Sequence, residues 1–397
     1  MSLKRKQYTS KFTLIGVPKV KEGTFKMNQV NEKSTWKYSS MFLNIDCGER
    51  HGSIACELMG GYSIADNKTS ILYKYGKKED GSADFENRME IDWEDRFNEN
   101  IIKECADNSF ITIGIEKTKD GSPYYKKFLS EYDAIEYLHK YLTADECKNM
   151  VVKVNGNLVY SEYNNQVRVS HRITSIRIID KEPKDFTATF RQSILLTSKS
   201  ATKNNLDEKG KTLFVDGKVL EYRKFIGDKE YKSQYPYPYT FEYNFPTDNE
   251  IQRNKIMDKL FKVEPNTVTQ INFNGEIVAS GSTVEVTYDD LTDDIKELIE
   301  CGIYTEEEAL KECADNSSFR NKMVLKTPII QKTDEGNVVQ VFKEMFEEKD
   351  LNIDVDELKD VNTTNSATTT NKSDTTSVSE TKANEDDDDL AFLDDLI

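Results

Sequence analysis

Hydrophobic and polar positions alternate in short runs along residues 1–361, with few stretches of helical spacing. Between 36 and 62 the alternation is interrupted once, at the glycine-containing segment 48–52, which is typical of a β-hairpin. Similar runs predict strands over 71–76, 111–115, 167–179, 187–196 and 240–245. The pattern predicts a mainly β fold with some helix.

Two further segments share the pattern strand, Asn-Gly, strand. They are residues 151–160, around Asn155-Gly156, and residues 267–278, around Asn274-Gly275. Asn-Gly favours two-residue hairpin turns, because both residues tolerate a positive φ. We therefore predict a tight hairpin at each position. By the same argument Asp216-Gly217 predicts a hairpin over 213–225.

Each Asn-Gly segment follows a predicted helix. Residues 131–142 place apolar side chains at helical spacing, and Thr247-Asp248 can cap a helix over 249–261. Three strands, a helix and two strands is the element order of the OB-fold, a small barrel that binds oligonucleotides. Two OB-fold-like barrels with different insertions are expected, and an unrelated pair of modules is the alternative.

The boundaries expected from this order are 1–185 for the first OB-like domain and 186–361 for the second. The second domain includes an acidic helical region, with helices over 293–301 and 305–313. Residues 362–397 form the last segment. Of its first 21 residues eight are Thr, four Ser and three Asn, so we expect a disordered linker there.

Charge is distributed very unevenly along the chain. The 397 residues carry a formal charge of −17, yet residues 1–283 hold 40 acidic and 43 basic side chains. Residues 284–361 hold 22 acidic and nine basic side chains, and residues 362–397 hold nine and two. The acidity therefore lies at the C-terminal end, and the net charge does not argue against a polyanionic partner of the first 283 residues.

Acidic residues at the end of the chain are followed by an apolar cluster. Such an end is typical of a short interaction motif, whereas a purely solubilising tail has no reason to expose apolar side chains. The predicted partner-binding tip consists of Asp386, Asp387, Asp388, Asp389, Leu390, Phe392, Leu393, Asp394, Asp395, Leu396 and Ile397.

Aromatic and basic residues are interleaved on several predicted strands in the net-positive part of the chain. Proteins that bind single strands need this mixture, since bases stack on rings while cations follow the phosphates. The candidate DNA-binding residues are Trp36, Lys37, Tyr38, Tyr73, Lys74, Tyr75, Lys153, Tyr160, Arg168, Arg172, Arg177, Tyr222, Arg223 and Lys224. For any one of them, a ring turned into the core is the simpler interpretation.

Motifs for catalysis are weak. Residues 205–212 end like a phosphate-binding loop but have Asn205 where the first glycine is needed. Cys47, His51 and Cys56 lack a fourth zinc ligand and the tight pair spacing of structural sites. No cofactor, metal site or catalytic residue is predicted. Six cysteines without a CxxC pair fit a reducing cytoplasm, and neither a signal sequence nor an apolar run long enough for a membrane span is present.

The barrel order, the linker and the acidic tip together resemble single-stranded DNA-binding proteins of the SSB type, in a bacteriophage-like version. The resemblance implies an OB-fold core whose acidic tip recruits replication and repair enzymes. The segment 386–397 resembles that tip, and 151–179 resembles the hairpin between the fourth and fifth strands. This chain departs from the family in ending with Leu396-Ile397 instead of Pro-Phe, in its Thr/Asn-rich linker and in its length.

The sequence therefore predicts a non-enzymatic, cytoplasmic protein that binds single-stranded DNA in replication or recombination. Its tail is expected to recruit partner proteins. Two alternatives stay open at this point. One is a virion scaffold protein built from β-barrels, and the other is a metal-dependent nuclease that uses acidic residues such as Asp92 and Glu94.

Overall fold

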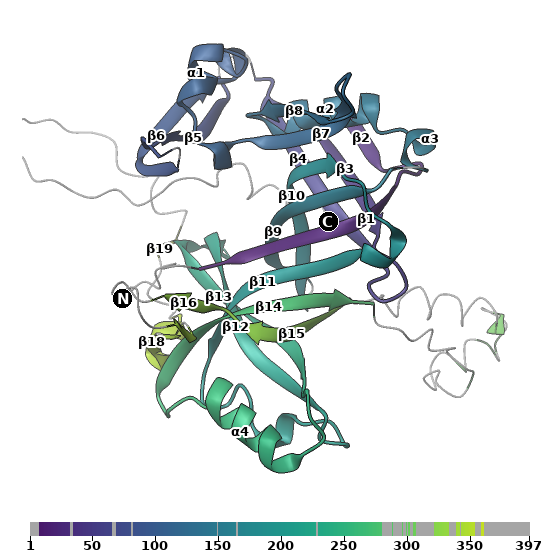
Figure 1. Ribbon diagram of the computed structural model, residues 1–397. Helices are drawn as coiled ribbons and strands as arrows, with labels where there is room; N and C mark the ends of the chain where they lie inside the picture. The colour runs from purple at the N-terminus through teal and green to yellow at the C-terminus, as the bar shows by residue number, and fades with distance from the viewer. Residues whose placement is uncertain are drawn as a thin grey trace, which may run out of the picture.

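A computed structural model describes residues 8–279 apart from 32–34, 66–68, 81, 149, 164–165 and 228, and beyond 279 residues 288, 296, 299, 301, 305–306, 321–332, 339–341, 343–353 and 359–360. The described chain is mainly β (Figure 1). Its strands are β1 (Ser10–Lys19), β2 (Phe25–Asn31), β3 (Trp36–Asp46), β4 (Ser53–Ser63), β5 (Ile71–Lys77), β6 (Ala83–Asp92), β7 (Ile111–Lys117), β8 (Pro123–Phe128), β9 (Val152–Tyr163), β10 (Gln166–Ile178), β11 (Thr187–Leu196), β12 (Thr212–Ile226), β13 (Lys229–Asn244), β14 (Thr267–Val278), β15 (Lys322–Pro328), β16 (Ile330–Lys332), β17 (Val339–Val341), β18 (Lys343–Glu347) and β19 (Lys359–Asp360). The α-helices of the described residues are α1 (Glu99–Glu104), α2 (Glu131–Tyr141), α3 (Ala144–Cys147) and α4 (Glu250–Leu260).

The first half closes a five-stranded barrel. β1 pairs with β3, β3 with β4, β4 in parallel with β10, β10 with β9, and β9 again with β1. The helix α2 lies between the third and fourth barrel strands in sequence and buries six residues, among them Ile135 and Leu138. This order and pairing is that of an OB-fold.

The second half closes a ring of the same topology. β11 pairs with β12, β12 with β13, β13 in parallel with β15, β15 with β14, and β14 again with β11. The helix α4 takes the position of α2, with Asn249 as its N-cap instead of the predicted Thr247-Asp248. The prediction of a mainly β fold with OB-fold-like barrels is confirmed.

The two rings are joined through their first strands. β1 pairs antiparallel with β11, so that Phe12 lies opposite Phe190 and Lys11 opposite Arg191. One sheet therefore continues from one ring into the other, as the central strands of Figure 1 show. A single connected hydrophobic core also extends through both rings. The division into domains at 185 and 186 stays a prediction.

The predicted Asn-Gly turns are wrong, because each lies in the middle of a continuous strand. Gly156 belongs to β9 and Gly275 to β14, and neither has a positive φ. A Cβ on Gly156 would lie 2.5 Å from the ring of Phe12, and one on Gly275 would lie 2.1 Å from the ring of Phe190. Each glycine leaves room for the phenylalanine ring of the neighbouring strand. Close approach of a neighbouring group is a known reason for glycine inside a strand, apart from turns.

The predicted hairpin around Asp216-Gly217 is wrong for the same reason. Gly217 lies within β12, where a Cβ would meet the Ile194 side chain at 2.2 Å. The actual hairpin joins β12 to β13 after Ile226, so both strands are long enough to extend beyond the barrel. The hairpin predicted around 48–52 is confirmed, with Asp46 opposite Ser53.

Two additions distinguish the rings. In the first, the described part of residues 64–130, between β4 and α2, forms an arm of β5, β6 and α1 and continues into β7 and β8 (Figure 1). In the second, the segment 343–353 lies against the outside of the barrel, where β18 pairs with β14 and Leu351 packs on Leu195, Leu220 and Val268. The predicted helices over 293–301 and 305–313 lie almost entirely outside the described residues, as does the whole of 361–397.

Candidate nucleic-acid interface

One row of paired residues crosses the junction between the two rings. Directly paired residues lie on the same face of a sheet, and here this is the outer face, since the neighbouring Phe12 and Phe190 are buried. The row consists of Arg172 in β10, Asn157 in β9, Lys11 in β1, Arg191 in β11 and Asn274 in β14. We call these five residues the cation row.

The charges in the cation row are not balanced within it. Lys11 lies directly opposite Arg191, an arrangement of like charges that destabilises a sheet. Arg191 donates a hydrogen bond from Nε to Asn274 Oδ1 at 3.0 Å, and Lys11 makes no ion pair with a described residue. Glu57 in β4 pairs with Arg172 only at the outer end of the row. A bound anion would therefore relieve the repulsion at the centre.

The cation row borders and enters a groove of about 1060 Å³. Hydroxyl and amide side chains line its floor, including those of Thr13, Thr189 and Asn155. One wall comes from the segment that follows the arm, where Asp107 and Phe110 face the groove. The groove thus combines cations with hydrogen-bonding groups contributed by both rings.

The two carboxylates that line the groove are already paired with cations. Asp107 accepts a hydrogen bond from Lys127 Nζ at 2.7 Å, which holds the pKa of Asp107 below its ordinary value. Glu276 Oε2 lies 2.5 Å from Arg50 Nη2 and 3.4 Å from Lys326 Nζ. Burial tends to raise the pKa of Glu276, but these two partners bring it below its ordinary value. Neither carboxylate therefore neutralises the cation row.

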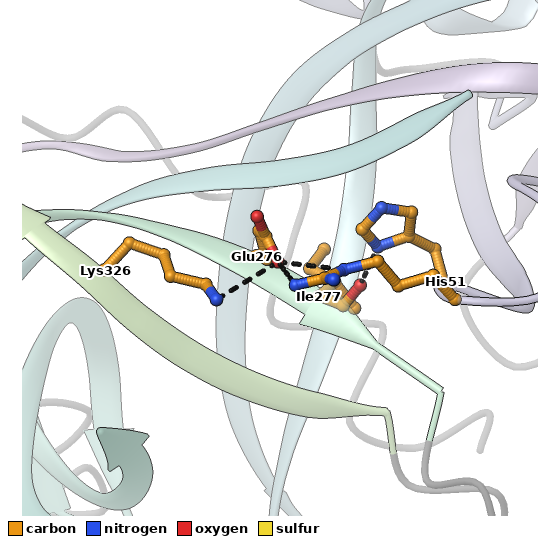
Figure 2. A network of polar contacts seen from close by, with 5 residues as sticks. His51, Glu276, Ile277 and Lys326 are labelled. Carbon is orange, nitrogen blue, oxygen red and sulfur yellow. Dashed lines mark hydrogen bonds and ion pairs between the residues drawn. The ribbon is translucent and has the colours of Figure 1, made fainter. Parts of the chain in front are cut away.

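Figure 2 shows that the Glu276 network also fixes the two rings to each other. Lys326 and Glu276 belong to β15 and β14 of the second ring, and His51 and Arg50 lie in the β3–β4 turn of the first. The buried His51 ring places Nδ1 at 2.6 Å from the backbone oxygen of Ile277. These contacts link the two rings at one end of the groove.

Lys153 and Arg177, both predicted from sequence, lie on the same outer surface beyond the cation row. They face each other across β9 and β10. Arg177 donates a hydrogen bond to the Tyr125 hydroxyl at 3.2 Å, and Tyr125 is 46% exposed on β8. Cations and an exposed ring therefore continue the surface of Arg172 across the first ring.

Three further predicted cations, Arg168, Arg223 and Lys224, lie toward the tips of two long hairpins. Arg168 stacks on Tyr163 at the end of β9–β10, with its guanidinium carbon 4.4 Å from the ring centroid. Arg223 lies 5.2 Å from the Tyr235 centroid and 3.6 Å from the Glu162 carboxylate. Its neighbours Tyr222 and Lys224 are half-buried on the same strand, β12. These residues join the hairpins of the two rings and are not part of the groove.

Tyr160 contradicts its prediction as a DNA-binding residue. The side chain is 2% exposed, its hydroxyl donates to Gln192 Oε1 at 3.2 Å, and its ring packs edge-on against Tyr239. Alternation along β9 turns this ring into the core, so it is not available to stack on a base.

Trp36, Lys37 and Tyr38 lie where β3 meets an aromatic cluster. Lys37 Nζ is 5.8 Å from the centroid of Tyr62, which stacks on Trp93 with a centroid separation of 4.6 Å. The guanidinium of Arg96 lies over Trp93 and over Phe97, a ring that is 60% exposed. Trp36 and Tyr38 are half-buried on the same strand.

Tyr73, Lys74 and Tyr75 lie on β5 of the arm, which pairs with β6 in a separate two-stranded sheet. The guanidinium of Arg88 lies 4.1 Å from the Tyr73 centroid. Tyr75 contacts Phe85, which is 64% exposed. The structure therefore divides the predicted residues among the outer sheet surface, the hairpin tips, the β3 end and the arm.

Sequence reasoning missed Lys11, Arg191 and Lys326. No dense run of aromatic and basic residues marks them, since β1 and β15 each hold two well-separated lysines and β11 holds Arg191 alone. The available signal was the alternation of β1 and β11, which turns Lys11 and Arg191 outward next to a buried phenylalanine. What makes them a site is their pairing across 180 residues of chain.

The structure gives no support to a phosphate-binding loop at 205–212. The carboxylate of Asp207 accepts hydrogen bonds from the backbone N–H groups of Lys211 and Thr212, so these donors are not available to an anion. Among the described residues no group of three or more His, Cys, Asp or Glu is placed to hold a metal ion. Within the same residues no helix is long and apolar enough to cross a membrane. The predicted tip, 386–397, lies outside the described part of the chain.

No family model and no curated protein matches this chain. Among solved structures it is similar to a deletion mutant of the single-stranded DNA-binding protein from Thermus aquaticus, with 11% sequence identity and a TM-score of 0.31. The alignment covers 69% of this chain and 89% of that one.

Proposed function

We propose that this protein binds single-stranded DNA without enzymatic activity, along the groove that crosses both rings. The cation row carries the proposal. Lys11 and Arg191 face each other with no carboxylate between Arg172 and Asn274, so a phosphate backbone would supply the missing counter-charge. The amide groups of Asn157 and Asn274, which line the groove, can donate to phosphate or base oxygens without fixing a sequence.

The wider role extends the same proposal. A protein that covers unpaired strands in the cytoplasm serves DNA replication or recombination, and the acidic tip 386–397 would recruit proteins of those processes. The tip's carboxylates and apolar side chains support this part, since they are suited to a basic-rimmed apolar groove on a partner.

Salt dependence tests the proposal. Five phosphate contacts, from Lys11, Lys153, Arg172, Arg177 and Arg191, give a decrease in affinity of roughly 100-fold between 50 and 200 mM salt. We expect oligo-dT to quench the intrinsic fluorescence with this salt dependence. The double variant Lys11→Glu, Arg191→Glu loses two contacts, so its decrease should be at most about 20-fold, from a weaker starting affinity.

A matched control is Lys255→Glu, an exposed lysine on α4 at the opposite end of the second ring. It should bind oligo-dT like the unaltered chain. An unaltered chain that shows no salt-sensitive binding, or a double variant that binds equally well, would refute the proposal.

A further inference from the structure

A second cavity, of about 420 Å³, lies on the outside of the second ring. Its walls are mainly apolar, and its one charged lining residue is Lys218 of β12. The other lining residues are Ile226, Tyr235, Pro236, Pro238, Leu351, Asn352 and Ile353. The pocket is therefore an apolar cleft with a single cation.

The pocket owes its shape to the segment 343–353. β18 pairs with β14, and Leu351, only 4% exposed, packs on Leu195, Leu220 and Val268. This packing holds Asn352 and Ile353 opposite Tyr235 and the two prolines of β13. Proline fixes φ, so Pro236 and Pro238 restrict the backbone conformations of the wall formed by β13. Strand pairing and apolar packing therefore define both walls of the cleft.

Lys218 is half-buried in this cleft and makes no ion pair with any described residue. Burial lowers its pKa, and the charge of Glu348 acts in the opposite direction. A desolvated cation gains most from a carboxylate that enters the cleft with it. The cleft therefore favours a ligand with both an acidic group and apolar side chains.

We propose that this cleft binds the C-terminal end of the same chain, residues 385–397. Leu396 and Ile397 would contact the apolar walls, while a carboxylate of this end, from Asp394, Asp395 or the chain terminus, would face Lys218. The chemistry of the segment matches the cleft on both counts, since it alternates carboxylates with large aliphatic side chains.

The course of the chain supports this occupant. β19 pairs with Lys229 and Glu230 of β13, next to the cleft residue Ile226. From Asp360 another 37 residues follow. Such a length spans at most about 130 Å when fully extended, so the end of the chain can reach the cleft easily. A tethered ligand of this kind has an effective concentration on the order of 1 mM.

The cleft and the groove are separate sites. Lys218 and Tyr235 belong to β12 and β13, whereas the groove is lined from β1, β7, β9, β10, β11, β14, β15 and the segment 107–110. Docking of the end would therefore conceal the tip from partner proteins without covering the cation row. This inference does not depend on DNA binding.

A peptide titration tests it. The receptor is the full chain with Leu396→Ser and Ile397→Ser, so that its own end does not compete. The probe is a fluorescent peptide of residues 385–397, titrated by anisotropy with protein up to about 1 mM, the concentration that matters for a tethered ligand. We expect saturable binding that Lys218→Glu weakens at least about tenfold, as for loss of one charge-assisted contact. The control Lys255→Glu should leave the affinity unchanged.

Three outcomes would overturn the inference. They are no binding up to that concentration, equal binding by Lys218→Glu, and equal binding by the cleft variant Ile226→Lys with an unchanged melting temperature. Oligo-dT titration of the same variants separates the two proposals. If Lys218→Glu binds oligo-dT normally but not the peptide, the cleft is an independent site, and the failure of either ligand leaves the test of the other intact.

Discussion

The two rings have the same strand pairing but differ in what covers the outer face of their second and third strands. In the first ring the β3–β4 face leaves Phe42 43% exposed. In the second, the segment 343–353 covers β12 and buries Leu220. One topology therefore leaves this face open in one copy and covered by a later segment of the chain in the other.

The rings are alike where they meet. Each places a phenylalanine of its first strand against a glycine of its fourth, Phe12 at Gly156 and Phe190 at Gly275. The β1–β11 junction brings these two units together around a local two-fold relation. The groove lies across this junction, where antiparallel pairing sets Lys11, which precedes Phe12, opposite Arg191, which follows Phe190. The differences lie at the outside of the rings, where loops tolerate insertion.

The largest expected effect concerns the paired glycines. A valine at Gly275 would place Cβ 2.1 Å from the Phe190 ring, and one at Gly156 would place it 2.0 Å from the backbone oxygen of Arg172. Each of Gly275→Val and Gly156→Val should lower the free energy of unfolding by about 3 kcal/mol or more, measured by urea titration. Asn157→Val, one position further on the exposed side, is the control. If Gly275→Val were as stable as the unaltered chain, the conclusion that Gly156 and Gly275 have the same packing role in the two rings would be wrong.

The covered and open faces can be compared directly. Leu351→Ala should lower the free energy of unfolding by about 2–3 kcal/mol, because it removes a buried side chain from a four-residue cluster. Phe42→Ala, on the open face of the first ring, should change it by less than about 1 kcal/mol. If thermal or urea unfolding gave the same loss of free energy for Leu351→Ala and Phe42→Ala, the second ring would not have a covered face that the first ring lacks.

A largely buried ion pair joins the arm of the first ring to α2. Arg96 Nε lies 2.8 Å from the Asp133 carboxylate, which is 7% exposed. Arg96→Met should lower the free energy of unfolding by about 2 kcal/mol at pH 7. The exposed pair of Lys103 and Glu99 provides the control variant Lys103→Met, which should lose less than about 0.5 kcal/mol.

The pH dependence of that loss is part of the same prediction. Burial raises the pKa of Asp133 above its ordinary value, despite the opposing hydrogen bond and charge of Arg96. Without Arg96 the pKa rises further, so the folded variant takes up a proton more readily than the unfolded chain. The deficit of Arg96→Met should therefore become smaller as the pH falls from 7 toward 4. A deficit that does not depend on pH would contradict the assignment to Asp133.

The smallest effect concerns His171, on β10 of the first ring. Burial lowers its pKa from 6.5 to about 4. The unfolded chain therefore binds a proton in a range where the fold does not, and stability that is complete above pH 6.5 is lost as the pH falls toward 4. Between pH 7 and 5.5 the loss is about 1 kcal/mol. His171→Leu should remove this part of the acid dependence, whereas His139→Gln, at an exposed position on α2, should not.

Local pattern predicted the elements whose determinants are local. The strands 71–76, 111–115 and 187–196, the β3–β4 hairpin and the helix at 131–142 follow from alternation, turn glycines and helical spacing within a few residues. The order of these elements was sufficient for the OB-fold class. Lys153, Arg172 and Arg177 lie on the outer face of the sheet, because basic residues on an alternating strand face outward when the apolar positions face inward, and their role in DNA binding stays a prediction.

Tertiary structure decided the meaning of the glycines and the position of the groove. An Asn-Gly pair taken by itself predicts a turn. In the folded chain, however, Gly156 and Gly275 lie within strands, where the rings of Phe12 and Phe190, more than 80 residues away in sequence, leave no room for a side chain. The alternation along β9 does not by itself show which face of the strand is buried. Only the closed barrel shows that Tyr160 lies on the buried face. Lys11 and Arg191 become neighbours only through the β1–β11 pairing, since a sequence fixes the face of each strand but not its partner.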